Sequence, residues 1–188
     1  MSSEDAFDID EAIAAKPITP FSHLPPSTFN IDESKKKFFE MKKNGENYFD
    51  TLFETEFDSA GYSVFHFDYK YNNEFIGKPD FVTSNIINGY KQQIPMNRFI
   101  FGTLNLVESP GIPDENDPSF LSDGSIGLQG VFIIRGDTVT AELLDPLNDY
   151  CTWTKLELNK ETIPLISQQF YSDTNILGAM LKERVLCV

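Results

Sequence analysis

The chain has 188 residues, among them 17 Phe, 7 Tyr and one Trp, and its formal net charge is −14. A domain of about 150 residues buries roughly 70% of the surface that its unfolded chain exposes, so this aromatic content predicts a core that depends on neither disulfides nor metal. An acidic protein gains nothing from displacing the counterions of phosphate groups, and direct binding to nucleic acid is therefore disfavoured.

Two cysteines, Cys151 and Cys187, occur without the spacing of a metal site. We find no secretory leader at the start, no N-glycosylation sequon, and no apolar run near the roughly 18 residues that a membrane span requires. We therefore expect a cytoplasmic protein without a membrane segment. In that reducing compartment, a disulfide between the two thiols is the less favoured alternative.

Residues 1–19 are predicted as an acidic, flexible N-terminal tail, and residues 20–188 as the folded domain. The first 16 residues contain five acidic side chains and one Lys, with too few apolar side chains to form a core. The alternative is a segment that becomes ordered when it contacts a partner.

The first helix is predicted to begin after Asn30 and to end before Asn44-Gly45. Asn30 is a good N-cap, and the two acids that follow it suit the positive end of the helix dipole. We expect the lysines at 35–37 to be solvated instead of forming a nucleic-acid patch. The inner face is expected to contain Phe38, Phe39 and Met41.

Apolar residues at steps of three and four predict a second helix over 48–57, which Ala60-Gly61 ends. A strand over 62–71 follows, with its aromatic side chains at odd positions on one face. Aromatic stripes also occur in RNA-binding sheets, but this chain lacks their glycine-aromatic spacing and their basic charge. We therefore assign the stripe to the core.

Residues 72–80 are predicted as a turn region, 81–87 as a short strand followed by a helix that Pro95 ends, and 99–107 as another strand. Residues 108–124 contain three prolines and five acids. They are predicted as an acidic inserted loop at the surface, either a tolerated excursion or a partner contact.

The stretch from Ser125 to Leu156 is predicted to organise the domain. Its uninterrupted apolar run, Val131 to Ile134, indicates a strand buried on both faces. The sequence Arg135-Gly136-Asp137 predicts a tight reversal, so residues 138–144 are expected to return as the second strand of an antiparallel hairpin. Trp153 is expected to close one end of the core.

A last clear helix is predicted over 160–171, with Pro164 in its first turn. Its inner edge is expected to contain Leu165, Ile166, Gln169 and Phe170. The apolar segment 176–188 is expected to pack on the body through Leu177, Met180, Leu181 and Val185.

No set of residues points to catalysis, and we expect no enzyme, no cofactor and no metal. The two histidines, His23 and His66, have no Ser-His-Asp arrangement or nucleophile elbow to work with. The glycines at 124, 127 and 130 precede a strand instead of a helix, so no helix N-terminus receives a phosphate there.

Several segments, in the same order along the chain, resemble the C-terminal domain of translation elongation factor 1 gamma. The resemblance implies an α+β fold: a single compact domain in which an antiparallel sheet of about five strands is flanked by helices. In the segment from Gly61 to Phe65, the smaller aromatic residues Tyr62 and Phe65 stand where the family has tryptophan. The segments are Pro20-Phe-Ser-His-Leu-Pro-Pro-Ser-Thr-Phe29, Gly61-Tyr-Ser-Val-Phe65, Asp68-Tyr-Lys-Tyr71, Ser84-Asn-Ile-Ile-Asn-Gly89, the apolar strand ending in Arg135-Gly136, and Thr152-Trp-Thr-Lys-Leu156.

The resemblance also implies a non-catalytic gamma-type subunit of the elongation factor 1 complex. Such a subunit supports nucleotide exchange on the tRNA-delivering GTPase through contacts with the exchange factor and the GTPase. In the family, the contact with the exchange factor is attributed to an N-terminal glutathione-transferase-like domain, which these 188 residues do not include. We therefore expect a stand-alone paralogue, a reduced protein or a fragment. The alternative is a generic module that binds a peptide or protein outside translation.

Residues within the resembling segments are the candidates for protein contacts: Arg135, Trp153, Lys155, Tyr69 and Asn85. Arg135 is either a recognition residue for carboxylate or phosphate groups, or a structural ion pair or turn cap. Trp153 is either a core plug or an interface anchor.

Overall fold

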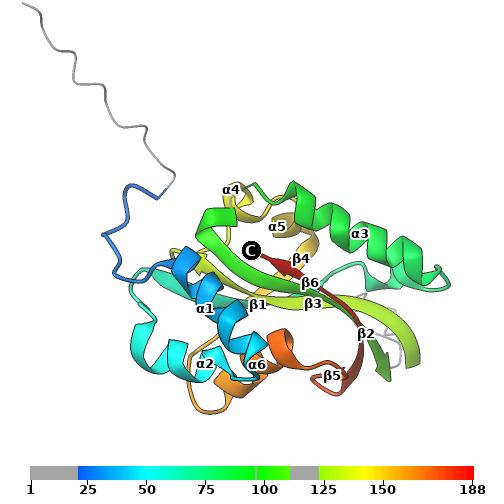
Figure 1. The fold of residues 1–188 in the computed structure, drawn as a ribbon. Helices are drawn as coiled ribbons and strands as arrows, with labels where there is room; N and C mark the ends of the chain where they lie inside the picture. The colour runs from blue at the N-terminus through cyan, green and yellow to red at the C-terminus, as the bar shows by residue number, and fades with distance from the viewer. Residues whose placement is uncertain (1–20, 96, 111–122) are drawn as a thin grey trace, which may run out of the picture.

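The protein has three layers, with a six-stranded antiparallel sheet between two layers of helices (Figure 1). The computed structural model describes residues 21–95, 97–110 and 123–188, so the predicted tail 1–19 lies outside the described residues. The order of strands across the sheet is β4-β1-β3-β2-β6-β5. The expected α+β class is confirmed, with six strands where about five were predicted.

The strands are β1 (Tyr62–Tyr69), β2 (Ile100–Pro110), β3 (Asp123–Arg135), β4 (Cys151–Lys155), β5 (Asn175–Ile176) and β6 (Ala179–Cys187). The α-helices are α1 (Ile31–Lys43), α2 (Tyr48–Thr51), α3 (Asp80–Gln93), α4 (Ala141–Leu144), α5 (Leu147–Tyr150) and α6 (Thr162–Tyr171). A π-helical turn η1 (Leu52–Glu56) continues α2, and two 3-10 turns are η2 (Asn72–Phe75) and η3 (Asn97–Phe99).

Strand β3 lies in the middle of the sheet and is buried on both faces, as its apolar run predicts. Its side chains alternate, so that Phe132 packs toward α3, α4 and α5 while Val131 and Ile133 pack toward α1, α2 and α6. Both of its edges are occupied, because β1 and β2 pair with it in antiparallel register.

The predicted hairpin partner of β3 is wrong. Gly136 does turn the chain, with φ of +90°, but residues 138–144 form no strand and end in the short helix α4. With β1 and β2 on its two edges, β3 has no edge left for a third strand. The apolar residues Leu143 and Leu144 are instead fully buried on one face of the sheet. The true hairpin joins β2 to β3.

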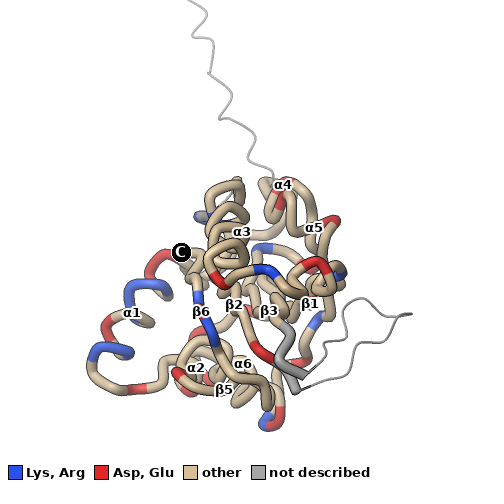
Figure 2. The backbone as a smooth tube through the Cα atoms, turned by 90° about the vertical axis from the view of Figure 1, so that its right-hand side faces the viewer, with Lys and Arg blue, Asp and Glu red and all other residues tan. Residues whose placement is uncertain are grey.

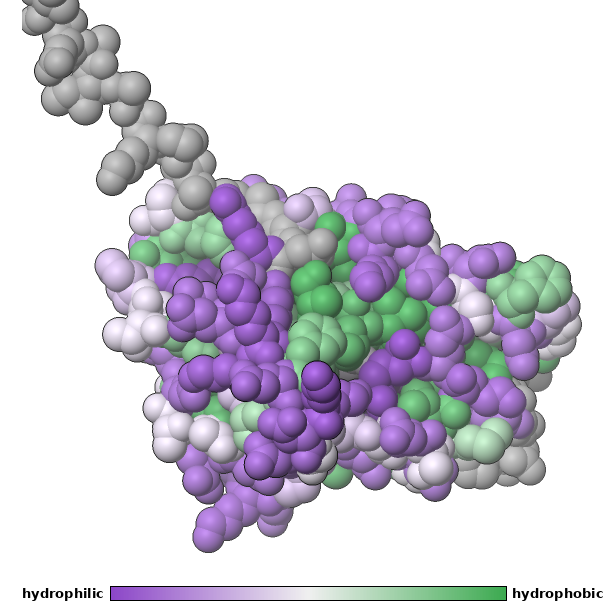
Figure 3. Space-filling model, in the orientation of Figure 1, coloured by the Kyte–Doolittle hydropathy of each residue, from purple (hydrophilic) through white to green (hydrophobic). Residues whose placement is uncertain are grey.

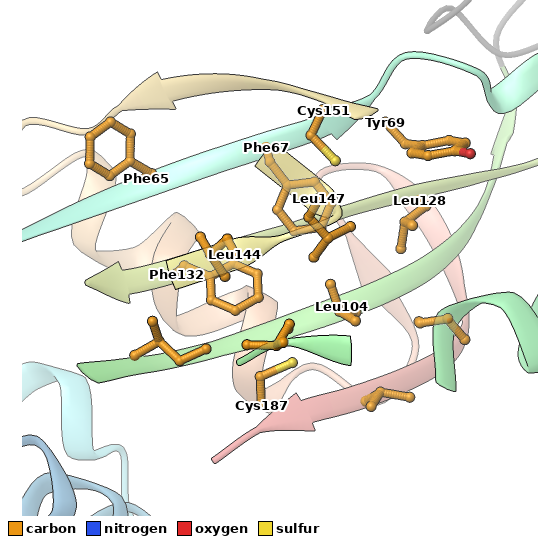
Figure 4. Packing of buried hydrophobic residues seen from close by; sticks show 14 of the residues in the cluster. Phe65, Phe67, Tyr69, Leu104, Leu128, Phe132, Leu144, Leu147, Cys151 and Cys187 are labelled. Carbon is orange, nitrogen blue, oxygen red and sulfur yellow. The ribbon is translucent and has the colours of Figure 1, made fainter. Parts of the chain in front are cut away.

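Two aromatic-rich clusters hold the layers together. The first lies between the sheet and the layer of α3, α4 and α5, where Phe67 and Phe132 of adjacent strands meet Leu144 and Leu147 (Figure 4). The second lies under α1, α2 and α6, where Phe38, Phe49, Phe101 and Phe170 form a continuous set of ring contacts.

The segment predicted as a strand over 81–87 is the first half of helix α3. Thr83 and Ile87, four residues apart, are its buried positions, whereas Phe81 is 66% exposed. The buried positions of this segment therefore have helical spacing, although its apolar, β-branched residues had suggested a strand. The helix ends at Gln93, two residues before Pro95, as predicted.

Several predicted inner-face residues are exposed. Phe39 of α1, Leu165 of α6, Leu177 in the turn before β6, and Met180 at an outward position of β6 are each 45–47% exposed. Residues 176–188 form mainly the strand β6, in which only alternate side chains point inward. Conversely, Lys35 is buried and bonds Asp32 at 3.2 Å, while Lys36 and Lys37 are exposed as expected.

The strands β2 and β3 reach into the range predicted as an acidic loop. Residues 108–110 and 123–124 belong to these strands, so the pairing extends further than the sequence indicated. The remaining predicted loop residues, 111–122, lie outside the described residues.

The two cysteines are free and buried at separate places in the sheet (Figure 4). Cys151 belongs to β4 and Cys187 to β6, with β1, β3 and β2 between them. Three intervening strands separate the two thiols by roughly 19 Å, far beyond the span of a disulfide. Burial raises the pKa of Cys187 to about 12 and raises that of Cys151 as well.

Gly130 of β3 occupies a point in the sheet where no side chain fits. A Cβ atom there would lie 1.9 Å from the carbonyl oxygen of Thr103 and 2.7 Å from the Phe67 ring. The neighbouring strands therefore approach each other at this point only because position 130 has no side chain.

We predict that Gly130→Ala lowers the free energy of unfolding by at least about 2 kcal/mol, because the added methyl group overpacks the centre of the sheet. Urea unfolding followed by circular dichroism measures the change. The matched control is Gly89→Ala on α3, where a Cβ meets nothing within 4 Å. This control should raise stability by up to about 1 kcal/mol. Equal stability of Gly130→Ala and wild type would contradict the packing described here.

Ser34 is a buried polar residue of α1. Its hydroxyl oxygen accepts a hydrogen bond from the Tyr48 hydroxyl at 3.0 Å, with Glu56 as a second acceptor at 3.2 Å. Burial raises the pKa of Tyr48 from 10.0 to about 12.

The unfolded chain therefore releases this proton before the folded chain does, and the free energy of unfolding should fall as pH rises from about 10 toward about 12. Urea unfolding at several alkaline pH values tests this expectation. In Tyr48→Phe, which cannot ionise at this position, the decline over the same pH range should be smaller. A decline as steep as in wild type would assign the effect to other groups.

Candidate protein-contact surface

The five residues proposed for protein contacts do not form one site. Tyr69, Trp153 and Lys155 share the face of the sheet that α3, α4 and α5 cover, because β1 and β4 pair Tyr69 with Cys151 and Phe67 with Trp153. Asn85 is exposed on α3, and Arg135 lies on the opposite face of the sheet.

Arg135 is only 7% exposed, and its guanidinium group ties chain segments together. It donates to the carbonyl oxygen of Gly61 at 2.7 Å and also to that of Pro25, and it lies over the Tyr62 ring. A Cβ at Gly61 would meet the guanidinium group at 2.2 Å, so the glycine leaves the space that the arginine fills. The arrangement matches the turn-capping alternative.

Trp153 packs against the core and is also partly exposed. Its ring packs on Phe67 at 5.2 Å and on Phe132 at 5.9 Å between centroids, so one side belongs to the core. It nevertheless belongs to β4, which pairs with β1 alone among the strands of the described residues, and it stays partly exposed. Its neighbours Thr152, Thr154 and Lys155 are exposed. β4 therefore offers an open edge to which an extended peptide can add.

Apolar residues gather in the middle of the face drawn in Figure 3, beside the C-terminal end of β6. Acidic and basic residues follow one another in short blocks along α1 (Figure 2).

A cavity of about 130 Å³ lies beside His66, between α6 and the sheet. Its walls are mainly the apolar side chains of Val131, Leu156 and Ile166, and the Nδ1 atom of His66 lies 3.4 Å from Asp68. The residues that the structure describes contain no Ser or Cys nucleophile in the lining of this cavity.

A polar network anchors α6 to the sheet next to this cavity. Asn105, which interrupts the apolar pattern of β2, donates to the Gln169 side chain at 2.8 Å and accepts from Thr103 at 3.0 Å. Arg184 of β6 donates to Asn105 at 3.2 Å and to the Gln169 carbonyl at 2.9 Å. These bonds explain why a fully buried asparagine is tolerated in an apolar strand.

A cup of tyrosines that the sequence did not indicate lies at the end of β1. This tyrosine cup has a volume of about 470 Å³ and is lined by Tyr69, Tyr71, Glu74, Tyr90, Gln93, Pro146 and Tyr150. The alternation of β1 placed Tyr69 and Tyr71 on one face. No sequence signal brought Tyr90 of α3 and Tyr150 of α5 beside them, since both arrive through tertiary packing.

Within the ranges that the structure describes, no group of three or more His, Cys, Asp or Glu side chains is arranged to hold a metal ion. In the same ranges, no helix has the length and apolarity that crossing a bilayer requires.

Comparison with known proteins identifies one family. The family model described as elongation factor 1 gamma, conserved domain, matches residues 16–138. The elongation factor 1-gamma of Drosophila melanogaster is 30% identical over 177 residues, which are 89% of this chain and 36% of that protein. Those of Prunus avium and Sus scrofa are each 28% identical, over 85% and 90% of this chain and 35% and 37% of theirs. The chain thus spans about a third of the length of these relatives.

We predict that Arg135→Met lowers the free energy of unfolding by about 2 kcal/mol, because the substitution keeps the apolar stem but leaves two carbonyl groups without their charged donor. Urea unfolding gives the value. Lys155→Met, a change of the same kind at an exposed position, should shift stability by less than about 0.5 kcal/mol. Unchanged stability of Arg135→Met with weakened partner binding would instead favour the recognition role.

Proposed function

This chain belongs to the elongation factor 1 gamma conserved-domain family, and we propose that it acts as a non-catalytic gamma-type subunit of the elongation factor 1 complex. In this role it supports nucleotide exchange on the tRNA-delivering GTPase through protein contacts in the cytoplasm. The observation that carries the proposal is the family match over residues 16–138.

The architecture supports a role in holding other proteins. Both faces of the sheet are filled by packed aromatic clusters, and the described residues contain no metal-binding group of side chains. The open edge of β4, with Trp153 and Lys155, and exposed Asn85 on the neighbouring face provide candidate contact points. The proposed partners are the exchange factor and the GTPase, with no direct contact to nucleic acid.

A second candidate is a peptide-binding module that acts outside translation. The open edge of β4 favours it, because an extended peptide can pair with the unoccupied backbone groups of an edge strand. In this case the bound segment would continue the sheet beyond β4.

Affinity purification of the chain from its source cells tests the first candidate. We expect recovery of the exchange factor and the GTPase, and faster nucleotide release from the GTPase when the purified chain is added to the exchange factor. Lys155→Glu, a charge reversal beside the β4 edge, should lower this recovery several-fold. Lys36→Glu, an exposed reversal on α1, is the matched control and should leave recovery unchanged.

Absence of both elongation factors from the purified material, with no effect on nucleotide release, would contradict the first candidate. If an extended peptide were then captured and lost in Lys155→Glu, the second candidate would hold.

A further inference from the structure

The tyrosine cup contains four of the seven tyrosines of the chain, and their rings form a closed circuit. The ring centroids of Tyr69 and Tyr71 are 5.7 Å apart, those of Tyr71 and Tyr150 6.2 Å, those of Tyr150 and Tyr90 6.3 Å, and those of Tyr90 and Tyr69 6.0 Å. Rings spaced in this way allow one small group to lie within about 6 Å of the centroids of two adjacent rings, which is the range of a cation–π contact.

The lower part of the cup is fixed, and its upper part is accessible. Tyr69 is 5% exposed and its ring stacks on Phe75, with an interplanar angle of 16°. Its hydroxyl group shares a hydrogen bond of 3.0 Å with that of Tyr90. Tyr71 and Tyr150 are 40% and 42% exposed, so part of each side chain is accessible to a ligand.

The electrostatics of the cup favour a cation. Aromatic faces carry negative potential, and the carboxylate of Glu74 lies in the wall. Lys70, beside the cup, donates its ammonium group to the carbonyl oxygen of Asp149 at 2.9 Å and keeps its positive charge, which offsets part of this attraction. The chain as a whole has a net charge of −14, which attracts basic partners over longer distances.

The polar lining selects among cations. Glu74, Gln93 and the tyrosine hydroxyls offer acceptors around the cup. A guanidinium group has five N–H donors in a planar fork, is weakly hydrated, and stacks on aromatic rings, whereas a quaternary ammonium group has no donor for these acceptors. A lysine ammonium group is more strongly hydrated and is therefore more costly to place among the rings.

We propose that the tyrosine cup is a binding site for the guanidinium group of an arginine side chain presented by a protein partner. The site lies at the end of β1, with α3 and α5 supplying its side walls. The proposal stands apart from membership of the elongation factor 1 complex, because only the geometry and charge of the cup carry it.

The test is an NMR titration of the isolated chain with the blocked tripeptide acetyl-Gly-Arg-Gly-amide. We expect saturable shifts confined to residues around the cup, with a Kd of about 1 mM, as suits a single anchoring side chain. Replacing the arginine with citrulline, its neutral isostere, should abolish saturation. Peptides carrying lysine or trimethyllysine should bind more weakly than the arginine peptide.

Variants of the exposed part of the cup locate the site without disturbing its buried base. The double variant Tyr71→Leu/Tyr150→Leu keeps apolar bulk and removes two ring faces, so it should weaken binding of the arginine peptide about tenfold. Tyr71→Phe keeps the ring and should retain most of the affinity. Glu74→Gln should weaken binding up to about fivefold, whereas Glu46→Gln, an equal charge change at an exposed position beyond the end of α1, should not.

Equal binding of the citrulline and arginine peptides would overturn the proposal, as would unchanged affinity in the double tyrosine variant. Tighter binding of the lysine or trimethyllysine peptide would overturn the assignment to arginine. Absence of saturable shifts at about 10 mM peptide would overturn the site itself. None of these outcomes depends on whether elongation factors are recovered with the chain.

Discussion

The enclosure of β3 on four sides is the constraint on which the rest of the domain depends. β1 and β2 occupy its edges, and an aromatic cluster covers each face. Because neighbouring side chains along β3 belong to different clusters, the two helical layers share one strand as their support. The close approach of the strands at Gly130 then fixes how tightly the middle of the sheet is packed.

The polar bonds in the domain lie where a helix or a loop must be held in one position on this apolar framework. Arg135 ties the entry segment and Gly61 to the end of β3. Asn105 and Arg184 hold α6 through Gln169. Apolar packing has little directional preference. A buried donor or acceptor, in contrast, destabilises the fold if it has no hydrogen-bond partner. These polar groups therefore fix the positions of helices and loops. Apolar burial alone would allow each of these elements several positions.

Much of the fold could be predicted in segments whose apolar residues repeat with a single helical or strand period. Asn30 marks the start of α1, and the alternation of β1 separates Phe67 from Val64 correctly. Pairing could not be predicted, because adjacency in sequence suggested a partner for β3 that its occupied edges exclude. The tyrosine cup could not be predicted for a related reason. Its rings come from separate parts of the chain, and only the packing of α3 and α5 against the end of β1 brings them together.

The placement of the two thiols determines how readily each cysteine reacts with reagents in solution. Thiolate is the reactive form of cysteine, and burial with a raised pKa keeps both side chains in the unreactive form and out of reach of oxidants. Because β4 and β6 lie on opposite sides of the central strands, opening of one sheet edge uncovers one thiol and leaves the other covered. The rate at which each cysteine reacts with an alkylating reagent thus measures how often the sheet opens locally around that cysteine.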